Sequence, residues 1–324
     1  MKDNTKNEKS LQHFKMLWQR YGTIGIFLLL IIILTIIKPS AVFTPSSIVQ
    51  ILRQSAVNIL LSLGEFFAIL IAGIDLSVGA VAGLTGMIAA KLMVAGIPVG
   101  AAIFVCILAG TAIGWINGTL VNKTGLHPFI ITLGTQSIFF GIMLVISNSR
   151  NVFGFPASFS TLMNASLLIV PVPVVIALVV ALFCWFFTTK TKAGRNIYAL
   201  GGDIQSAWFS GVNVDLHRLI VFMISGTCSG IAGIVLLGRL GAAAPTAGTG
   251  YETYAIAAAI IGGTSFFGGK GKVLGVVIGG LIIGVINYGM TALTIPSSYQ
   301  KIVMGMLIII AVTIDHFVGA KNNR

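Results

Sequence analysis

The sequence predicts an all-α, polytopic transmembrane bundle of about ten helices. Of the 324 residues, 56% are hydrophobic and only 9% are charged, and the mean hydropathy is +1.00. These values lie far outside the composition of soluble domains. The apolar runs are of helix length, whereas a β-barrel would alternate apolar and polar residues in segments of about ten. Because each helical crossing needs roughly 20 residues, the chain has room for about ten spans.

The apolar runs follow one another with short polar breaks and divide the chain into three parts. Residues 1–20 form a polar, basic arm without a small-residue cleavage site, so we expect it to be retained. Residues 21–318 form a single transmembrane domain, and residues 319–324 form a short tail. The eighth run is short and bounded by glycines, so it could be a broken or half-crossing helix. The predicted spans are 22–37, 48–72, 76–95, 98–121, 127–147, 166–187, 217–238, 253–267, 273–294 and 301–318.

The distribution of basic residues predicts the orientation of the chain. With ten spans and the N-terminus inside, most of the 20 Lys and Arg residues collect on the cytoplasmic side. Both termini are then cytoplasmic, and so is the longest internal polar segment, 188–218. The net charge of +12 therefore points to anionic membrane lipid rather than to nucleic acid, because most basic residues flank spans.

The second span carries a polar stripe. Gln54, Asn58, Ser62 and Glu65 recur at i, i+4, i+8 and i+11, which places them within an arc of about 80° on a helix. A charge at mid-membrane costs roughly 2.5–3.5 kcal/mol, so we expect Glu65 to face protein rather than lipid. Two interpretations stay open: hydrogen bonding between helices, or the lining of a water-filled solute path.

Other polar residues within or beside spans extend this hypothesis. Asp75 and Ser77 lie where the third span should begin, so they either cap that helix or take a direct part in transport. Gln136 in the fifth span and Asn287 in the ninth could complete a polar lining with the second. The candidate path residues are therefore Gln54, Asn58, Glu65, Asp75, Ser77, Gln136 and Asn287.

Motifs for chemistry on this chain are missing. The nearest approach to a phosphate-binding loop, TSFFGGKG at Thr264–Gly271, has Thr in place of the first Gly and Gly after the Lys. No GxSxG or HExxH occurs, and the three cysteines lie in apolar runs without a CxxC pattern. We therefore expect no catalytic residue, no metal site and no cofactor bound by this chain.

Four glycine-rich stretches are distributed along the chain: GIDLSVG (Gly73–Gly79), GRNIYALGG (Gly194–Gly202) with SGVNV (Ser210–Val214), PTAGTGYE (Pro245–Glu252) and AIAAAIIGGTSFFGGKG (Ala255–Gly271). Together they resemble the permease subunits of bacterial ATP-binding-cassette importers for simple sugars, of the ribose, allose and xylose kind. The similarity runs in the family's order and spacing from about residue 20 to about residue 315, and four motifs in register are far more specific than one.

The resemblance implies a multi-pass protein of the bacterial inner membrane that imports a monosaccharide by alternating access. It implies a permease homodimer or heterodimer, two cytoplasmic ATPase subunits that hold ATP and Mg²⁺, and an extracytoplasmic sugar-binding protein. It also implies that the loop Gly194–Gly211 holds a coupling helix that docks on the ATPase. The implied coupling residues are Gly194, Arg195, Ala199, Gly201, Gly202, Asp203, Ser206, Ser210 and Gly211.

The sequence departs from the family's motif at one place, and two other functions stay open. Relatives usually show Asn-x-x-Ala-Ala after the paired glycines, whereas this chain has Asp203-Ile204-Gln205-Ser206-Ala207. The first alternative is an ion-coupled secondary transporter or channel for a small polar solute, which would need no ATPase. The second is a membrane-embedded enzyme, for which the sequence offers no nucleophile, base or metal cluster in register.

Overall fold

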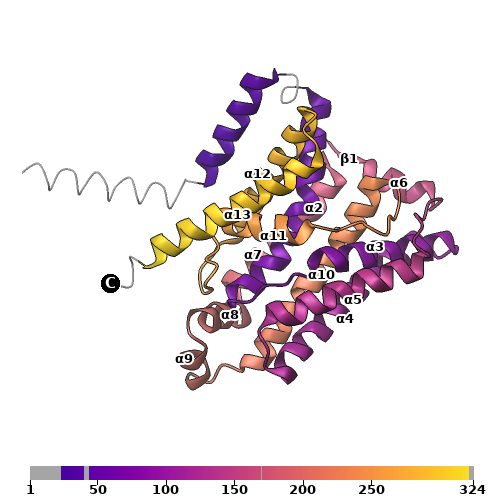
Figure 1. The fold of residues 1–324 in the computed structure, drawn as a ribbon. Coiled ribbons are helices and arrows are strands. Elements are labelled where there is room, and N and C mark those ends of the chain that lie inside the picture. Colours follow the sequence, from indigo (N-terminus) through magenta and orange to yellow (C-terminus); the bar gives the residue numbers. More distant parts are fainter. Residues whose placement is uncertain (1–22, 40–43, 169, 321–324) are drawn as a thin grey trace, which may run out of the picture.

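The computed structural model describes residues 23–39, 44–168 and 170–320 as a bundle of helices (Figure 1). The predicted N-terminal arm 1–20 lies outside the described residues, as does most of the tail. An apolar helix occurs in each predicted span. These helices are Thr23–Ile37, α2 (Pro45–Leu70), α3 (Val78–Val94), α4 (Val99–Thr124), α5 (Pro128–Ser147), α7 (Val172–Lys190), α10 (Val214–Leu240), α11 (Tyr251–Ile261), α12 (Val273–Ala292) and α13 (Ser297–Ala320).

Five of the described helices are long and apolar enough to cross a membrane: α4, α5, α7, α10 and α12. The chain is thus a helical membrane protein. The eighth predicted span contains α11, which has 11 residues and covers about 16 Å at 1.5 Å per residue. That length is about half of a hydrocarbon core of about 30 Å, so α11 is a short helix, as its flanking glycines suggest.

The sixth span begins later than predicted. Residues 166–171 form a small antiparallel hairpin of β1 (Ser166–Leu167) and β2 (Val170–Pro171), and α7 starts only at Val172. Pro171 explains the shift, because a proline disfavours the helical conformation of the residue before it, and Val170 lies in β2. Pro173 then fits within the first turn of α7, where no backbone donor is needed.

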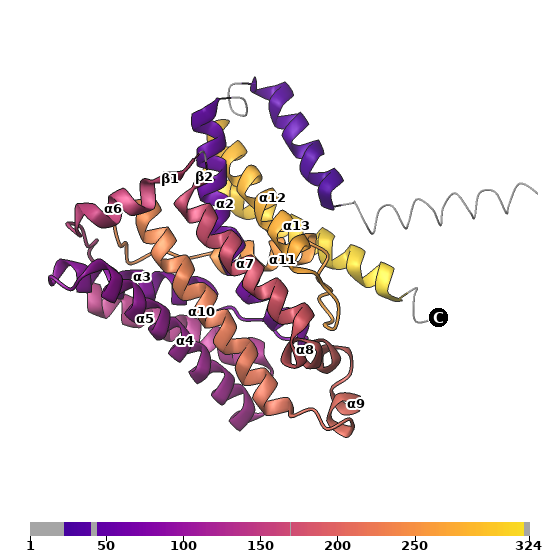
Figure 2. The same cartoon turned by 180° about the vertical axis from the view of Figure 1, so that it is seen from behind.

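The helix α2 is the centre of the bundle. Thr44 accepts a hydrogen bond from the backbone N–H of Ser47, and Pro45 opens the first turn, so the start of α2 is capped by its own sequence. Every residue from Ser55 to Leu70 is buried. In Figures 1 and 2, α2 lies between α12 on one side and α10 on the other, and it also packs against α7 and α11. It is therefore enclosed by protein on all sides.

Glycine rows allow this close packing. On α12, Gly275 and Gly279 face α11, where an added Cβ would strike the carbonyl oxygens of Gly262 and Ala258. Gly284, on another face, meets Ser55 of α2. Such close backbone approach is how helices associate within a membrane, where burial of apolar surface supplies little driving force.

Candidate coupling surface and translocation path

The cytoplasmic segment predicted at 188–218 folds into two short helices, α8 (Lys192–Gly202) and α9 (Ile204–Phe209). Thr191 caps α8 by accepting from the Gly194 backbone N–H at 3.0 Å. Asp203 caps α9 by accepting from the Ser206 backbone N–H at 2.6 Å. Asp203 itself is extended, so it breaks the segment into two helices directly after the paired glycines.

The inner face of α8 is wedged against the membrane domain. Ile197 and Leu200 are fully buried, and the Tyr198 hydroxyl donates to the Gly271 carbonyl at 2.9 Å. A Cβ added at Gly201 would strike the Leu70 carbonyl oxygen at the end of α2 and approach the Gly269 backbone nitrogen at 2.6 Å. Two of the predicted coupling residues, Gly194 and Gly201, therefore face inward and seat α8 on the bundle.

The other predicted coupling residues form the outer face of the segment, where seven of them are exposed: Arg195, Ala199, Gly202, Asp203, Ser206, Ser210 and Gly211. The structure adds three apolar side chains that sequence reasoning did not single out: Ile204 is 41% exposed, Trp208 61% and Phe209 79%. The sequence did contain a signal for them, because three large apolar residues stand close together in the longest polar segment of the chain. We call Ile204, Trp208 and Phe209 the α9 patch.

The charge of Asp203 is stabilised where it lies. Hydrogen bonds from the backbone and side chain of Ser206 lower the pKa of the Asp203 carboxyl. The carboxylate stays ionised at neutral pH and caps the positive end of α9. Next to α9, a cavity of about 470 Å³ is lined by Trp208, Gly211, Val212, Asn213, Val214 and Asp215. The segment thus presents a hollow beside an exposed apolar helix.

Asp75 is a hydrogen-bonding hub in the non-helical link between α2 and α3. Its Oδ1 accepts from the Ser77 backbone N–H at 3.0 Å and from the Ser77 hydroxyl at 2.6 Å. Its Oδ2 accepts from the Ser225 hydroxyl of α10 at 2.7 Å. The Asp75 backbone N–H donates to Glu65 Oε1 of α2 at 3.2 Å. Glu65, Asp75, Ser77 and Ser225 are all buried.

Two further helices reach the same link. Asn117 of α4 donates to the Ser77 hydroxyl at 2.9 Å. Thr132 of α5 accepts from the Leu76 backbone N–H at 3.1 Å and contacts the Ile74 carbonyl at 3.0 Å. Irregular backbone at membrane depth is tolerated only when buried in protein or facing water, and here these side chains satisfy it. The Asp75 hub therefore ties α2, α3, α4, α5 and α10 together.

The remaining candidate path residues lie apart from this hub. Asn58 and Asn287 are buried, and neither Asn58 Nδ2 nor Asn287 Oδ1 has a hydrogen-bond partner among the described residues. Gln54 on α2 and Gln136 on α5 are only half-buried, and Gln136 lies near the Glu252 carboxyl. The residues of the stripe predicted on α2 thus differ in burial and in hydrogen bonding along the helix.

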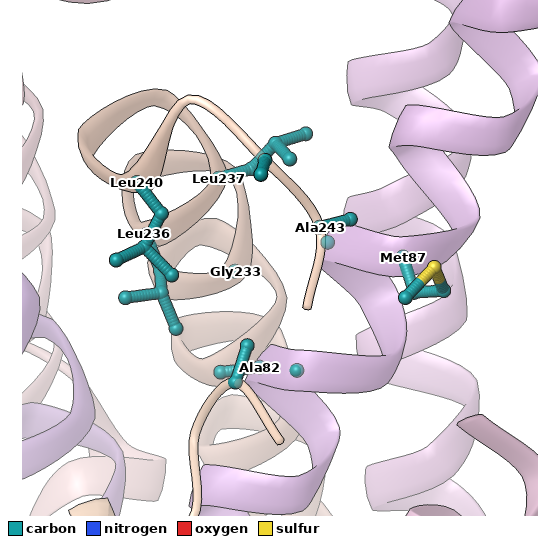
Figure 3. A pocket seen from close by; sticks show the side chains of 11 residues that line it. Ala82, Met87, Gly233, Leu236, Leu237, Leu240 and Ala243 are labelled. Carbon is teal, nitrogen blue, oxygen red and sulfur yellow. The ribbon is translucent and has the colours of Figure 1, made fainter. Parts of the chain in front are cut away.

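The loop between α10 and α11 folds inward instead of standing free. Figure 3 shows Ala243 of this loop beside a small apolar crevice between α3 and α10, near Met87 and Leu237. Added Cβ atoms at Gly79 and Gly83 of α3 would strike the carbonyl oxygens of Gly248 and Ala247 respectively. This loop, residues 241–250, is therefore part of the bundle's packing.

Comparison with known proteins decides the family. The family model described as "Branched-chain amino acid transport system / permease component" matches residues 47–312. The chain belongs to this permease family. The permease is 55% identical to the D-allose transport system permease protein of Escherichia coli K12, over 97% of this chain and 96% of that one. It is 41% identical to the ribose import permease protein of Haemophilus influenzae, over 99% of both chains.

A third relative, the galactose/methyl galactoside import permease protein of E. coli K12, is 35% identical over 92% of this permease and 95% of its own length. No solved structure matches the chain. The resemblance predicted from the motifs is thereby confirmed. The protein is a multi-pass permease of the inner membrane and not an enzyme, since ATP hydrolysis in such importers lies in partner subunits.

Proposed function

We propose that the permease carries a monosaccharide of the allose or ribose kind into the cytoplasm by alternating access. Separate ATPase subunits that hold ATP and Mg²⁺ drive the cycle, and an extracytoplasmic binding protein delivers the sugar. The observation that carries the proposal is the α9 patch, an exposed apolar surface seated on a helix wedged against the central helix. The 55% identity to a D-allose permease supports the substrate class.

The proposed arrangement in the membrane has ten spans with both termini in the cytoplasm. It places the arm 1–20 and the tail 319–324 on the same side as the coupling loop 188–218, with residues 21–318 as one transmembrane domain. The excess of basic residues on that side supports this orientation. Two permease copies, identical or different, form the core, and this chain itself binds neither nucleotide nor metal.

Force would pass from the ATPase to α2 through α8. Gly201 lies against the last carbonyl of α2, and the Gly269 backbone N–H donates to that same Leu70 oxygen at 2.9 Å. A displacement of α8 must therefore move the end of α2 or break this contact. Driving a two-state core from 1:99 to 99:1 needs about 5.5 kcal/mol of differential interaction with the partner. A contact that is equally strong in both states shifts nothing, so the aromatic anchors on α9 hold the partner while the displacement of α8 carries the differential energy.

Replacing Trp208 and Phe209 together with serine tests the docking surface. We expect co-purification of the ATPase to fall more than about tenfold, because each removed anchor is worth about 2 kcal/mol at an interface. Assembly of the permease in detergent should stay normal by size-exclusion chromatography, since both side chains are mostly exposed. Gln205→Ser, on the same helix and also exposed, is the matched control.

The same preparation separates the proposal from an ion-coupled transporter. If the double variant keeps its full complement of ATPase, the α9 patch is not the docking surface. If the wild-type protein purifies alone and its vesicles take up sugar down an ion gradient without ATP, the permease is a secondary transporter.

The proposed translocation path includes the candidate residues Gln54, Asn58, Glu65, Asp75, Ser77, Gln136 and Asn287. Support comes from orphaned polar atoms: Asn58 Nδ2, Glu65 Oε2 and Asn287 Oδ1 are buried without partners among the described residues. An unsatisfied buried group costs roughly 1–3 kcal/mol. Sugar hydroxyls or water could satisfy these atoms when the helices separate during the cycle.

Replacing Asn58 with leucine is expected to reduce sugar uptake severalfold while leaving ATPase docking unchanged. Leucine has the same number and branching of side-chain heavy atoms, with larger methyl groups, but offers no hydrogen bond to a passing hydroxyl. Uptake by reconstituted vesicles and co-purification of the ATPase measure the two effects separately. Leu60→Met, a volume-conserving change on the same buried helix, controls for packing. Full transport in Asn58→Leu would remove α2 from the path.

A further inference from the structure

A second large cavity lies between two of the long apolar helices and has a different chemical character. It is a groove of about 540 Å³ between α7 and α10, two helices that both pack on α2 and run alongside one another in Figure 2. Cys184 and Cys228 form its floor and are buried. We call it the α7–α10 groove; its lining residues include Val180, Phe183 and Phe187 on α7 and Ile220, Ile224 and Ile231 on α10.

The groove cannot recognise a sugar. Its two hydroxyls, on Thr111 and Thr227, bond each other at 2.7 Å. Each hydroxyl has one hydrogen, which it can donate to the other hydroxyl or to a carbonyl of its own helix, Ile107 at 2.9 Å from Thr111 and Met223 at 2.7 Å from Thr227. A polyhydroxylated ligand would lose its hydration there and gain at most these two acceptor oxygens. The groove therefore suits an apolar chain.

Its length and position fit one leaflet of a bilayer. The α10 wall runs from Ile220 to Ile231, about 16 Å at 1.5 Å per residue. That is about half of a hydrocarbon core of about 30 Å. The groove ends near Phe187, within one turn of the end of α7, so it opens toward the side on which Lys190 lies.

The charge at this end favours an anion. Phe183, Phe187 and Lys190 are spaced i, i+4 and i+7, so exposed Lys190 continues the groove-lining face of α7. The nearby acid on the facing helix, Asp215, lies about 140° around the helix axis from Ile220 and is directed away from the groove. Basic residues beside grooves between transmembrane helices bind anionic headgroups on the cytoplasmic side.

We propose that the α7–α10 groove binds an acyl chain of an anionic phospholipid from the cytoplasmic leaflet, with the headgroup phosphate on Lys190. The proposal rests on the orientation given under the proposed function. The bound lipid bridges α7 and α10, whose connection carries α8 and α9. The permease would thus hold a structural lipid directly behind its coupling segment.

Native mass spectrometry of the full-length permease, titrated with phosphatidylglycerol or phosphatidylcholine, tests the site. We expect retention of a phosphatidylglycerol molecule bound about fivefold more tightly than phosphatidylcholine, the ratio that one lysine near the surface supplies. Ile224→Trp and Val180→Trp, which fill the groove from opposite walls, should each abolish retention. Leu182→Trp, an exposed position of α7 outside the groove, should leave it unchanged.

A separate variant tests the contact between the lipid headgroup and Lys190. Lys190→Gln, at an exposed position that tolerates the change, should keep the lipid but reduce the preference for phosphatidylglycerol to about one. Lys123→Gln, at the exposed end of α4, is the control and should keep the preference. Equal retention of both lipids by the wild-type protein, or undiminished retention in both tryptophan variants, would overturn the proposal.

A second permease copy in the groove is the competing occupant. Photocrosslinks from position 183 to another copy, in dimers that carry no lipid, would also overturn the proposal. The lipid titration contains neither ATPase nor sugar, so its result is independent of the transport assays. Lipid binding with no ATPase association would contradict the proposed function alone.

Discussion

Replacing Gly201 with alanine is expected to abolish sugar uptake while the permease still inserts into the membrane. The added Cβ would strike the Leu70 carbonyl oxygen and displace the Gly269 N–H that donates to it. Both obstacles are backbone atoms, which cannot rotate away as a side chain can. Overpacking of this kind costs about 1–3 kcal/mol or more, so α8 should leave its seat on α2. ATP hydrolysis would then continue without being coupled to transport.

The adjacent glycine is the matched control. A Cβ at Gly202 meets nothing within 4 Å, so Gly202→Ala should fold normally and gain up to about 1 kcal/mol of helix propensity. Hydrogen exchange across α8 measures whether the helix stays seated, and uptake against ATP hydrolysis measures coupling. If Gly201→Ala transports normally with a protected α8, the wedge does not transmit force.

Replacing Asp75 with alanine is expected to destabilise the whole bundle. The change leaves the Ser77 backbone N–H, the Ser77 hydroxyl and the Ser225 hydroxyl without their acceptor in a buried site. Each unsatisfied buried group costs roughly 1–3 kcal/mol, so the loss is on the order of 3 kcal/mol or more. Thermal unfolding in detergent should show a large drop in midpoint temperature, together with loss of uptake.

Asp215→Ala separates this effect from the loss of a charge alone. Asp215 is exposed in the first turn of α10, so its removal should cost only about 0.3–1 kcal/mol through the helix dipole. Ser225→Ala provides an intermediate, because it removes just the Oδ2 contact to α10 and should lower the midpoint by less. An Asp75→Ala protein as stable as Asp215→Ala would contradict the role of Asp75 as a hub.

The sequence predicted that Glu65 is buried in protein, but it did not predict which helices surround α2. The cost of a charge in lipid predicted that Glu65 faces protein, and Glu65 is fully buried. The same argument treated residues 54–65 as one polar face. The structure shows α2 covered on all sides, because which helices surround it depends on contacts between segments far apart in the chain. Helical spacing reports direction around one axis and cannot report what lies in each direction.

Gly201 and Gly202 show the same difference between what the sequence predicts and what packing decides. Both belong to one motif and were predicted to serve the coupling loop together, yet one is pressed against α2 and the other faces open space. The hairpin that delays α7 was in principle readable from Pro171. The α9 patch was readable only in part, since exposure of Trp208 and Phe209 depends on where α8 anchors the segment.

Composition and the apolar runs were enough to determine that this chain is a helical, multi-pass membrane protein, because burial in lipid constrains the residues of every span. That it is a sugar permease came from the resemblance of its four motifs to a known family. The tertiary structure alone decided that α2 is the core, that the link around Asp75 joins five helices, and that an apolar groove separates α7 from α10. These features arise from contacts between residues distant in sequence, such as Asp75 with Ser225 and Gly201 with Leu70. No local pattern encodes such contacts, since they exist only once the helices have packed.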